Sequence, residues 1–131
     1  MVEMQIEYLG ELRCQAAHGP SGVTIQTDAP VDNHGRGESF SPTDTVAMAL
    51  AACELTIMGI KAKDKGWSLE GTKVRVEKHM SASPRRIARI VLEFQLPEAL
   101  APQQRDLLQR AAMQCPVKNS LHPDIELEHH F

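Results

Sequence analysis

The chain has 131 residues, of which 42% are hydrophobic and 4% aromatic, and a formal net charge of −3. This length predicts a single domain, residues 1–131, with one hydrophobic core. The charge and the scarcity of aromatic rings disfavour nucleic-acid binding, which needs a basic field and stacking surfaces. Residues 1–12 alternate and carry acids, unlike a signal peptide, and three cysteines fit a reducing compartment, so we expect a cytoplasmic protein.

Short strands are predicted at the start of the chain. Apolar and polar residues alternate over residues 5–9, and two further strands are expected at 13–16 and 23–25, separated by a Gly-Pro turn. We expect these strands to form a small antiparallel meander. Residues 28–40 are rich in Gly, Asp and Asn without any period, which predicts an irregular loop.

Residues 41–65 predict one long helix that is apolar on all faces. Ser41 can cap its start, Pro42 suits the first helical position, and Gly66 is a typical terminator. Such a helix must be surrounded by protein, so we expect it to be central and, in so small a chain, to favour a dimer. A membrane span is disfavoured because the apolar run is shorter than the roughly 20 residues required and Glu54 interrupts it.

The second half of the chain predicts two more strands, two helices and a last strand. Residues 73–77 and 89–96 alternate and are expected to pair as a hairpin. Helical spacing follows over 102–115, a short helix is expected at 117–121, and residues 125–131 alternate as a closing strand. The whole pattern predicts an α+β fold in which antiparallel sheets pack around the long helix.

Two cysteines are candidates for chemistry. Cys115 would cap the helix at 117–121, where unpaired backbone N–H groups and the helix dipole favour a thiolate. Cys53 lies in the apolar helix, where burial should raise its pKa unless a cation or donor reaches it. Simple packing is the alternative interpretation for both, and it is our interpretation of Cys14, on which no other group converges.

Other polar residues could support a thiol. Arg36 is the nearest cation before the helix, and Asp44 could hold it through a bidentate pair. The alternatives are that Asp44 only caps the helix and that Arg36 is solvated. Four of the six histidines lie far apart, and the adjacent His129 and His130 would point to opposite faces of a strand, so we expect neither a metal nor another cofactor.

Two motifs together resemble the OsmC/Ohr family. These are Ser41-Pro42-Thr43-Asp44 leading through Ala51-Ala52-Cys53, and Cys115-Pro116-Val117-Lys118-Asn119-Ser120-Leu121. The separation of the two cysteines also suits that family, and the resemblance covers nearly the whole chain. It implies antioxidant thiol peroxidases of the oxidative stress response, which reduce organic hydroperoxides and are intertwined α+β homodimers with both sites at the subunit interface.

Carried over to this sequence, the resemblance makes Cys53 the peroxidatic thiol and Cys115 the resolving thiol. Attack on the peroxide would give a sulfenic acid, which condenses with the second thiol to a Cys53–Cys115 disulfide. An external dithiol would then reduce this disulfide by exchange. The apolar surroundings of Cys53 would favour an alkyl or lipid hydroperoxide over hydrogen peroxide.

The chain departs from the family pattern in two places. Peroxidase branches place a glutamate after the proline that starts the helix and an arginine in the N-terminal hairpin loop, and the two pair beside the peroxidatic thiol. Here Thr43 follows that proline, with an acid one place later at Asp44, and the hairpin loop lacks arginine. Three alternatives follow: Arg36 substitutes for that arginine, His18 does, or the chain has no activating cation. The alternative function is a non-catalytic OsmC-like module that binds an apolar small molecule in a dimer-interface cavity.

Overall fold

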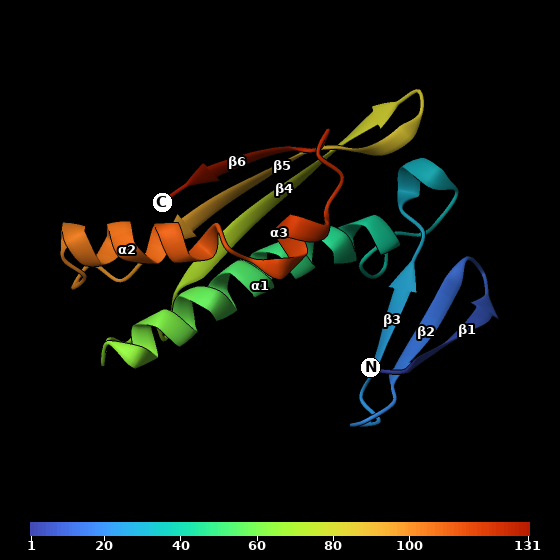
Figure 1. Cartoon of the computed structure of the whole chain (residues 1–131). Helices are drawn as coiled ribbons and strands as arrows, with labels where there is room; N and C mark the ends of the chain where they lie inside the picture. Colours follow the sequence, from blue (N-terminus) through green and yellow to red (C-terminus); the bar gives the residue numbers. More distant parts are fainter. The chain divides into compact units, whose positions relative to one another are not determined.

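The computed structural model describes residues 1–131, which fall into two compact units, Met1–Thr45 and Val46–Phe131. Figure 1 shows the elements of each unit in chain order. The fold is α+β, as predicted, with two three-stranded sheets and one long helix.

The first unit contains a meander of three antiparallel strands, β1 (Met4–Gly10), β2 (Arg13–His18) and β3 (Thr24–Asp28). This confirms the predicted strands and their order. The register places Ile6 opposite Ala16, and Ala16 opposite Ile25. Because alternate residues of a strand share a face, apolar residues gather on one face of this sheet. Several of them are exposed: Met4, Ile6, Tyr8 and Ile25.

The loop between β3 and the long helix is fixed by a buried carboxylate. Asp28 is 1% exposed, and its Oδ2 accepts the backbone N–H of Glu38 at 3.0 Å and lies 3.5 Å from Nη2 of Arg13. Arg13 also pairs with Glu38. The backbone N–H of Asp28 donates to the carbonyl of Phe40 at 3.0 Å. One side chain therefore ties the far end of the loop to two strands, which explains how a segment without any sequence period is ordered.

The long helix, α1 (Pro42–Asp64), follows the predicted range closely. Ser41 Oγ accepts the N–H of Asp44 at 3.1 Å, and Asp44 Oδ2 accepts the N–H of Ser41 at 2.8 Å, so the two form a reciprocal capping box. Gly66 has a φ of 75°, the left-handed conformation expected after a helix end. By length and composition alone α1 could span a membrane, as core helices often can.

The second unit has a mixed sheet, which corrects the expectation of antiparallel sheets throughout. Strands β4 (Lys73–Ala82) and β5 (Arg85–Gln95) form the predicted hairpin. Strand β6 (Glu126–His130) pairs with β5 in parallel. The chain returns through two helices before it enters β6, and a crossover of this length allows parallel pairing, which the alternation of β6 alone cannot reveal.

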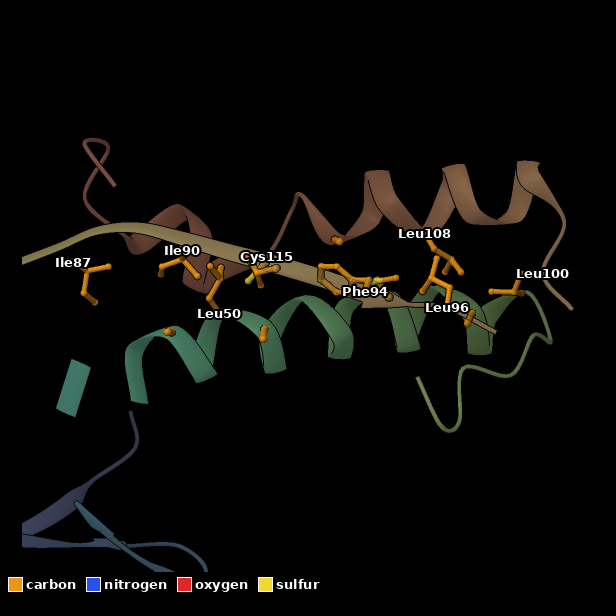
Figure 2. Close-up of a cluster of buried hydrophobic side chains, with 14 residues drawn as sticks. Leu50, Ile87, Ile90, Phe94, Leu96, Leu100, Leu108 and Cys115 are labelled. Carbon is orange, nitrogen blue, oxygen red and sulfur yellow. The ribbon is translucent and has the colours of Figure 1, made fainter. Parts of the chain in front are cut away.

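The two helices of this crossover are α2 (Pro102–Ala112) and α3 (Pro116–Ser120), both close to their predicted positions. The core of the unit lies where they meet α1 and β5. Figure 2 shows Leu50 of α1 and Ile90 and Phe94 of β5 between these two elements, and Leu108 projecting from α2 toward α1.

One face of α1 is left open. Leu50 and Met58 are fully buried, whereas Met48 is 43% exposed and Ile60 is 56% exposed. The prediction that the helix is surrounded on all sides is therefore not met by a single chain. The apolar residues on its open face need another covering surface, because exposed apolar area costs free energy in water.

Candidate active site

The structure brings Cys53 and Cys115 together. Cys53 lies in the middle of α1, Cys115 is the residue that caps α3, and the two side chains are near enough for Cys53 to raise the pKa of Cys115. Cys115 belongs to the core cluster, and Cys53 packs against that cluster. In Figure 2 the Cys115 side chain lies beside Leu50 in the space next to α1. Two thiols far apart in the sequence are thus placed within reach of one another.

Local geometry holds Cys115 in place. Its backbone is extended, with φ −64° and ψ 127°, and Pro116 occupies the first position of α3. Its sulfur accepts the backbone N–H of Lys118 at 3.4 Å. The predicted N-cap is therefore confirmed, and the proline explains it, since proline has no N–H to satisfy at the first helical position.

The ionisation of Cys115 differs from the prediction. Its side chain is fully buried, and burial, followed by the interaction with the neighbouring Cys53, raises the pKa of Cys115 above that of an ordinary thiol. The backbone N–H of Lys118 acts in the opposite direction but is outweighed. The N-cap position favours a thiolate, but burial of Cys115 in the core outweighs this local effect.

The two thiols also differ in access. Cys53 is partly exposed, whereas Cys115 is fully enclosed. A molecule from solvent can therefore meet the sulfur of Cys53 first. The protonated Cys115 can donate a hydrogen bond to Cys53, so the arrangement can stabilise negative charge on Cys53 and can later form a disulfide between the two sulfurs.

A buried acid beside Cys53 was not among the predicted site residues. Glu54 is fully buried, and its Oε1 lies 2.8 Å from Nε2 of His129. The signal was present in the sequence, because an acidic residue inside a helix that is otherwise apolar rarely occurs without a partner. The identity of that partner, a histidine at the far end of the chain, depends on the parallel pairing of β6.

The supporting residues proposed from the sequence lie in the first unit, and each has local partners. Asp44 forms the capping box with Ser41. Arg36 pairs with Glu11 at 3.2 Å, with both side chains well exposed. His18 Nδ1 lies 2.6 Å from the hydroxyl oxygen of Ser21. The Asp44 contact agrees with the capping alternative, and the exposed Arg36 agrees with the alternative that it is solvated.

The remaining candidate groups are consistent with the packing interpretation. Cys14 lies on β2 opposite Tyr8 of β1 and Thr27 of β3, and all three cysteines are free thiols. No group of three or more His, Cys, Asp or Glu side chains has the arrangement of a metal site.

With this geometry in hand, comparison with known proteins identifies the family. The family profile described as OsmC-like protein matches residues 35–130. The chain belongs to the OsmC-like family. No curated protein matches it. Solved structures with a similar fold include proteins named for organic hydroperoxide resistance.

Solved structures of this OsmC-like family support the fold. A protein from Psychrobacter arcticus 273-4, named for a proposed role in osmotic stress and detoxification responses, is 42% identical with a TM-score of 0.95, and the alignment covers 99% of this chain and 95% of that one. The organic hydroperoxide resistance protein OsmC from Legionella pneumophila is 17% identical with a TM-score of 0.77, covering 99% and 95%. An organic hydroperoxide resistance protein from Elizabethkingia anophelis is 15% identical with a TM-score of 0.76, covering 99% and 94%.

Proposed function

We propose that this OsmC-like protein is a thiol peroxidase that reduces organic hydroperoxides to alcohols, with Cys53 as the attacking thiol and Cys115 as the resolving thiol. The observation that carries the proposal is that these two side chains are neighbours: Cys53 packs against the core cluster that contains Cys115 and is near enough to raise the pKa of Cys115. A pair of free thiols in contact, one open to solvent and one enclosed, has the arrangement that a two-cysteine peroxidase requires.

The reaction has two protein-centred steps. The Cys53 thiolate attacks the terminal oxygen of ROOH, the O–O bond breaks, and Cys53 becomes a sulfenic acid while RO⁻ takes a proton and leaves as ROH. The Cys115 sulfur then attacks the Cys53 sulfur, and the sulfenic hydroxyl leaves as water with the Cys115 proton. The sulfur pair loses two electrons in total, and these reduce the peroxide.

The roles follow from burial. Cys115 is fully enclosed and keeps its proton, because burial and the neighbouring Cys53 raise the pKa of Cys115. A protonated thiol is a poor nucleophile toward peroxide, whereas it can donate a hydrogen bond to a thiolate beside it. The partly exposed Cys53 is therefore the better candidate for the first attack.

The cycle needs an external dithiol. The Cys53–Cys115 disulfide returns to two thiols by exchange with a dithiol donor, which is itself oxidised to a disulfide. The chemistry requires no cofactor or metal, and its place is a reducing compartment, the cytoplasm. No nucleic acid or membrane takes part in it.

The proposal includes an intertwined homodimer. The exposed apolar residues of the first sheet and of α1 (Met4, Ile6, Tyr8, Ile25, Met48 and Ile60) supply surfaces that a second copy would cover. Within such a dimer the single OsmC-like domain, residues 1–131, would have its apolar helix enclosed. We propose that in this homodimer Asp44, Arg36 or His18 helps to activate the Cys53 thiol.

Steady-state turnover tests the proposal. With a dithiol present, the protein should reduce cumene hydroperoxide faster than hydrogen peroxide, because the surroundings of Cys53 are apolar. Cys53→Ser should lose this turnover, while Cys14→Ser, the matched control on β2, should keep it. An active Cys53→Ser variant would contradict the peroxidase proposal. No turnover by the wild type, combined with binding of an apolar ligand that Cys53→Ser retains, would favour the non-catalytic module.

A further inference from the structure

A buried polar pair lies directly beside the proposed attacking thiol. Glu54 follows Cys53 in α1 and is fully buried. Its Oε1 lies 2.8 Å from Nε2 of His129 on β6, and its Oε2 is buried without a hydrogen-bond partner. A carboxylate is costly to bury and is tolerated only where a partner meets it. The position of Glu54 is therefore tied to the position of His129.

His129 is itself held firmly. Its side chain is 12% exposed, and its ring is nearly parallel to the rings of Phe94 and Phe131, with centroids at 6.4 and 6.0 Å. Phe94 and Phe131 stack on each other at 4.5 Å. Because β6 pairs with β5 along its whole length, the His129 ring is a fixed point on the sheet that faces α1.

Apolar burial alone does not fix the rotation of α1 about its axis. The helix carries apolar residues on every face: Leu50 and Met58 are buried, whereas the similar residues Met48 and Ile60 are exposed. Rotating the helix about its axis would bury other apolar side chains in place of those now buried, at little cost in apolar burial. It would also take Glu54 away from His129 and leave a buried carboxylate without its donor. One buried polar contact can select a single arrangement among several apolar ones, as a buried asparagine does in coiled coils.

The rotation of α1 decides where Cys53 points. Adjacent helix residues are separated by about 100° around the axis, so a fixed direction for Glu54 fixes the direction of Cys53. We propose that Glu54 and His129 form a positioning pair that sets the rotation of α1 and so holds the Cys53 sulfur against Cys115. The benefit of this pair to catalysis rests on the proposed function, but its effect on the placement of the two thiols can be tested without peroxide.

The test measures how readily the two thiols form a disulfide in a glutathione redox buffer. Cys53 attacks oxidised glutathione and releases one glutathione thiolate, and Cys115 then attacks Cys53 and releases the second. The equilibrium with glutathione gives the effective concentration of the thiol pair, which depends on their relative placement. Urea unfolding of each variant is measured in parallel, so that a change in the placement of the two thiols can be distinguished from a change in the free energy of unfolding.

The double variant Glu54→Met, His129→Phe removes the polar contact. Methionine is similar in side-chain length to glutamate, and phenylalanine keeps an aromatic ring in the stack. Replacing a buried pair by apolar groups is often neutral for stability. We expect unchanged unfolding and an effective concentration that falls at least tenfold. Glu54→Gln keeps an acceptor for the His129 N–H and should stay within threefold of the wild type, which makes it the matched control and the informative variant should the double variant not fold.

The outcomes separate this inference from the proposed function. A folded double variant with the wild-type effective concentration would overturn the positioning role, as would a Glu54→Gln variant that falls tenfold, or a wild type that forms no internal disulfide with glutathione. A wild type that forms the disulfide readily but does not reduce cumene hydroperoxide would overturn the peroxidase proposal and leave the positioning pair standing.

Discussion

The side chain of Cys115 is a neighbour of that of Cys53 in the core, and its sulfur accepts the backbone N–H of Lys118 at 3.4 Å. The first contact joins the cap of α3 to the middle of α1. The second prevents the buried sulfur from turning away. Cys115, the proposed resolving thiol, is therefore positioned beside Cys53 in the reduced protein.

Cys115→Ser should stop the reaction after its first step. Without a resolving thiol, one equivalent of cumene hydroperoxide should leave Cys53 as a sulfenic acid, which a carbon nucleophile specific for sulfenic acids traps and mass spectrometry detects. Turnover with a dithiol should fall well below the wild-type rate. Cys14→Ser is the control and should not accumulate the adduct. Full dithiol-dependent turnover by Cys115→Ser would show that Cys115 does not resolve the intermediate.

Stability should decrease at alkaline pH because of Cys115. Burial and Cys53 raise the pKa of Cys115 in the folded state, so above the ordinary thiol pKa of about 8.5 the unfolded chain releases a proton that the folded protein retains. The stabilising effect of the protonated form is complete below that pH and is lost as pH rises toward the folded-state pKa, with a limiting slope of about 1.4 kcal/mol per pH unit.

The measurement is urea unfolding of the reduced protein between pH 7 and 10. The Cys115→Ser variant should show a shallower decrease than the wild type, because serine does not titrate in this range. Parallel curves for the two proteins would mean that Cys115 is not the group responsible.

Stability should also decrease at acid pH because of Asp28. The backbone N–H of Glu38, together with Arg13, lowers the pKa of Asp28 in the folded state. Its carboxylate therefore stabilises the fold above the ordinary aspartate pKa of about 3.9, and this contribution is lost as pH falls through the lower folded-state value. Asp28→Asn should be less stable at pH 7 and should show a shallower acid decrease, whereas Glu98→Gln, at an exposed site, should resemble the wild type.

The open face of α1 should mediate dimer formation. Placing lysines at two exposed apolar positions, Met48→Lys with Ile60→Lys, should shift the sedimenting species from about twice the chain mass toward 14.5 kDa, because charged groups are costly to bury in an apolar interface. The control adds lysines at exposed positions elsewhere, Glu98→Lys with Gln103→Lys. A wild type that sediments as a monomer would remove the dimer from the account.

Local signals explain how much of the structure the sequence could predict. Ser41, Pro42 and Gly66 bound α1 through their own backbone preferences, and Pro116 sets the cap at Cys115, so these features were predictable. The parallel pairing of β6 was not, because it depends on the path of the chain through α2 and α3.

In the candidate site, too, local sequence predicts some features and the folded core determines the others. The pairing of Cys53 with Cys115 was expected only through a family resemblance, since no local pattern joins residues so far apart. The raised pKa of Cys115 depends on core packing around it, and the partner of Glu54 depends on the position of β6. Each of these is a property of the assembled core.

The most direct test of whether Cys53 and Cys115 react with a hydroperoxide is peptide mapping. The protein is oxidised with one equivalent of cumene hydroperoxide per subunit, denatured, and treated with an alkylating reagent that blocks the free thiols before digestion. The account predicts that the peptides containing Cys53 and Cys115 are joined by a disulfide within one subunit, while Cys14 remains free. Recovery of Cys53 and Cys115 as free thiols, with the hydroperoxide unconsumed, would contradict it.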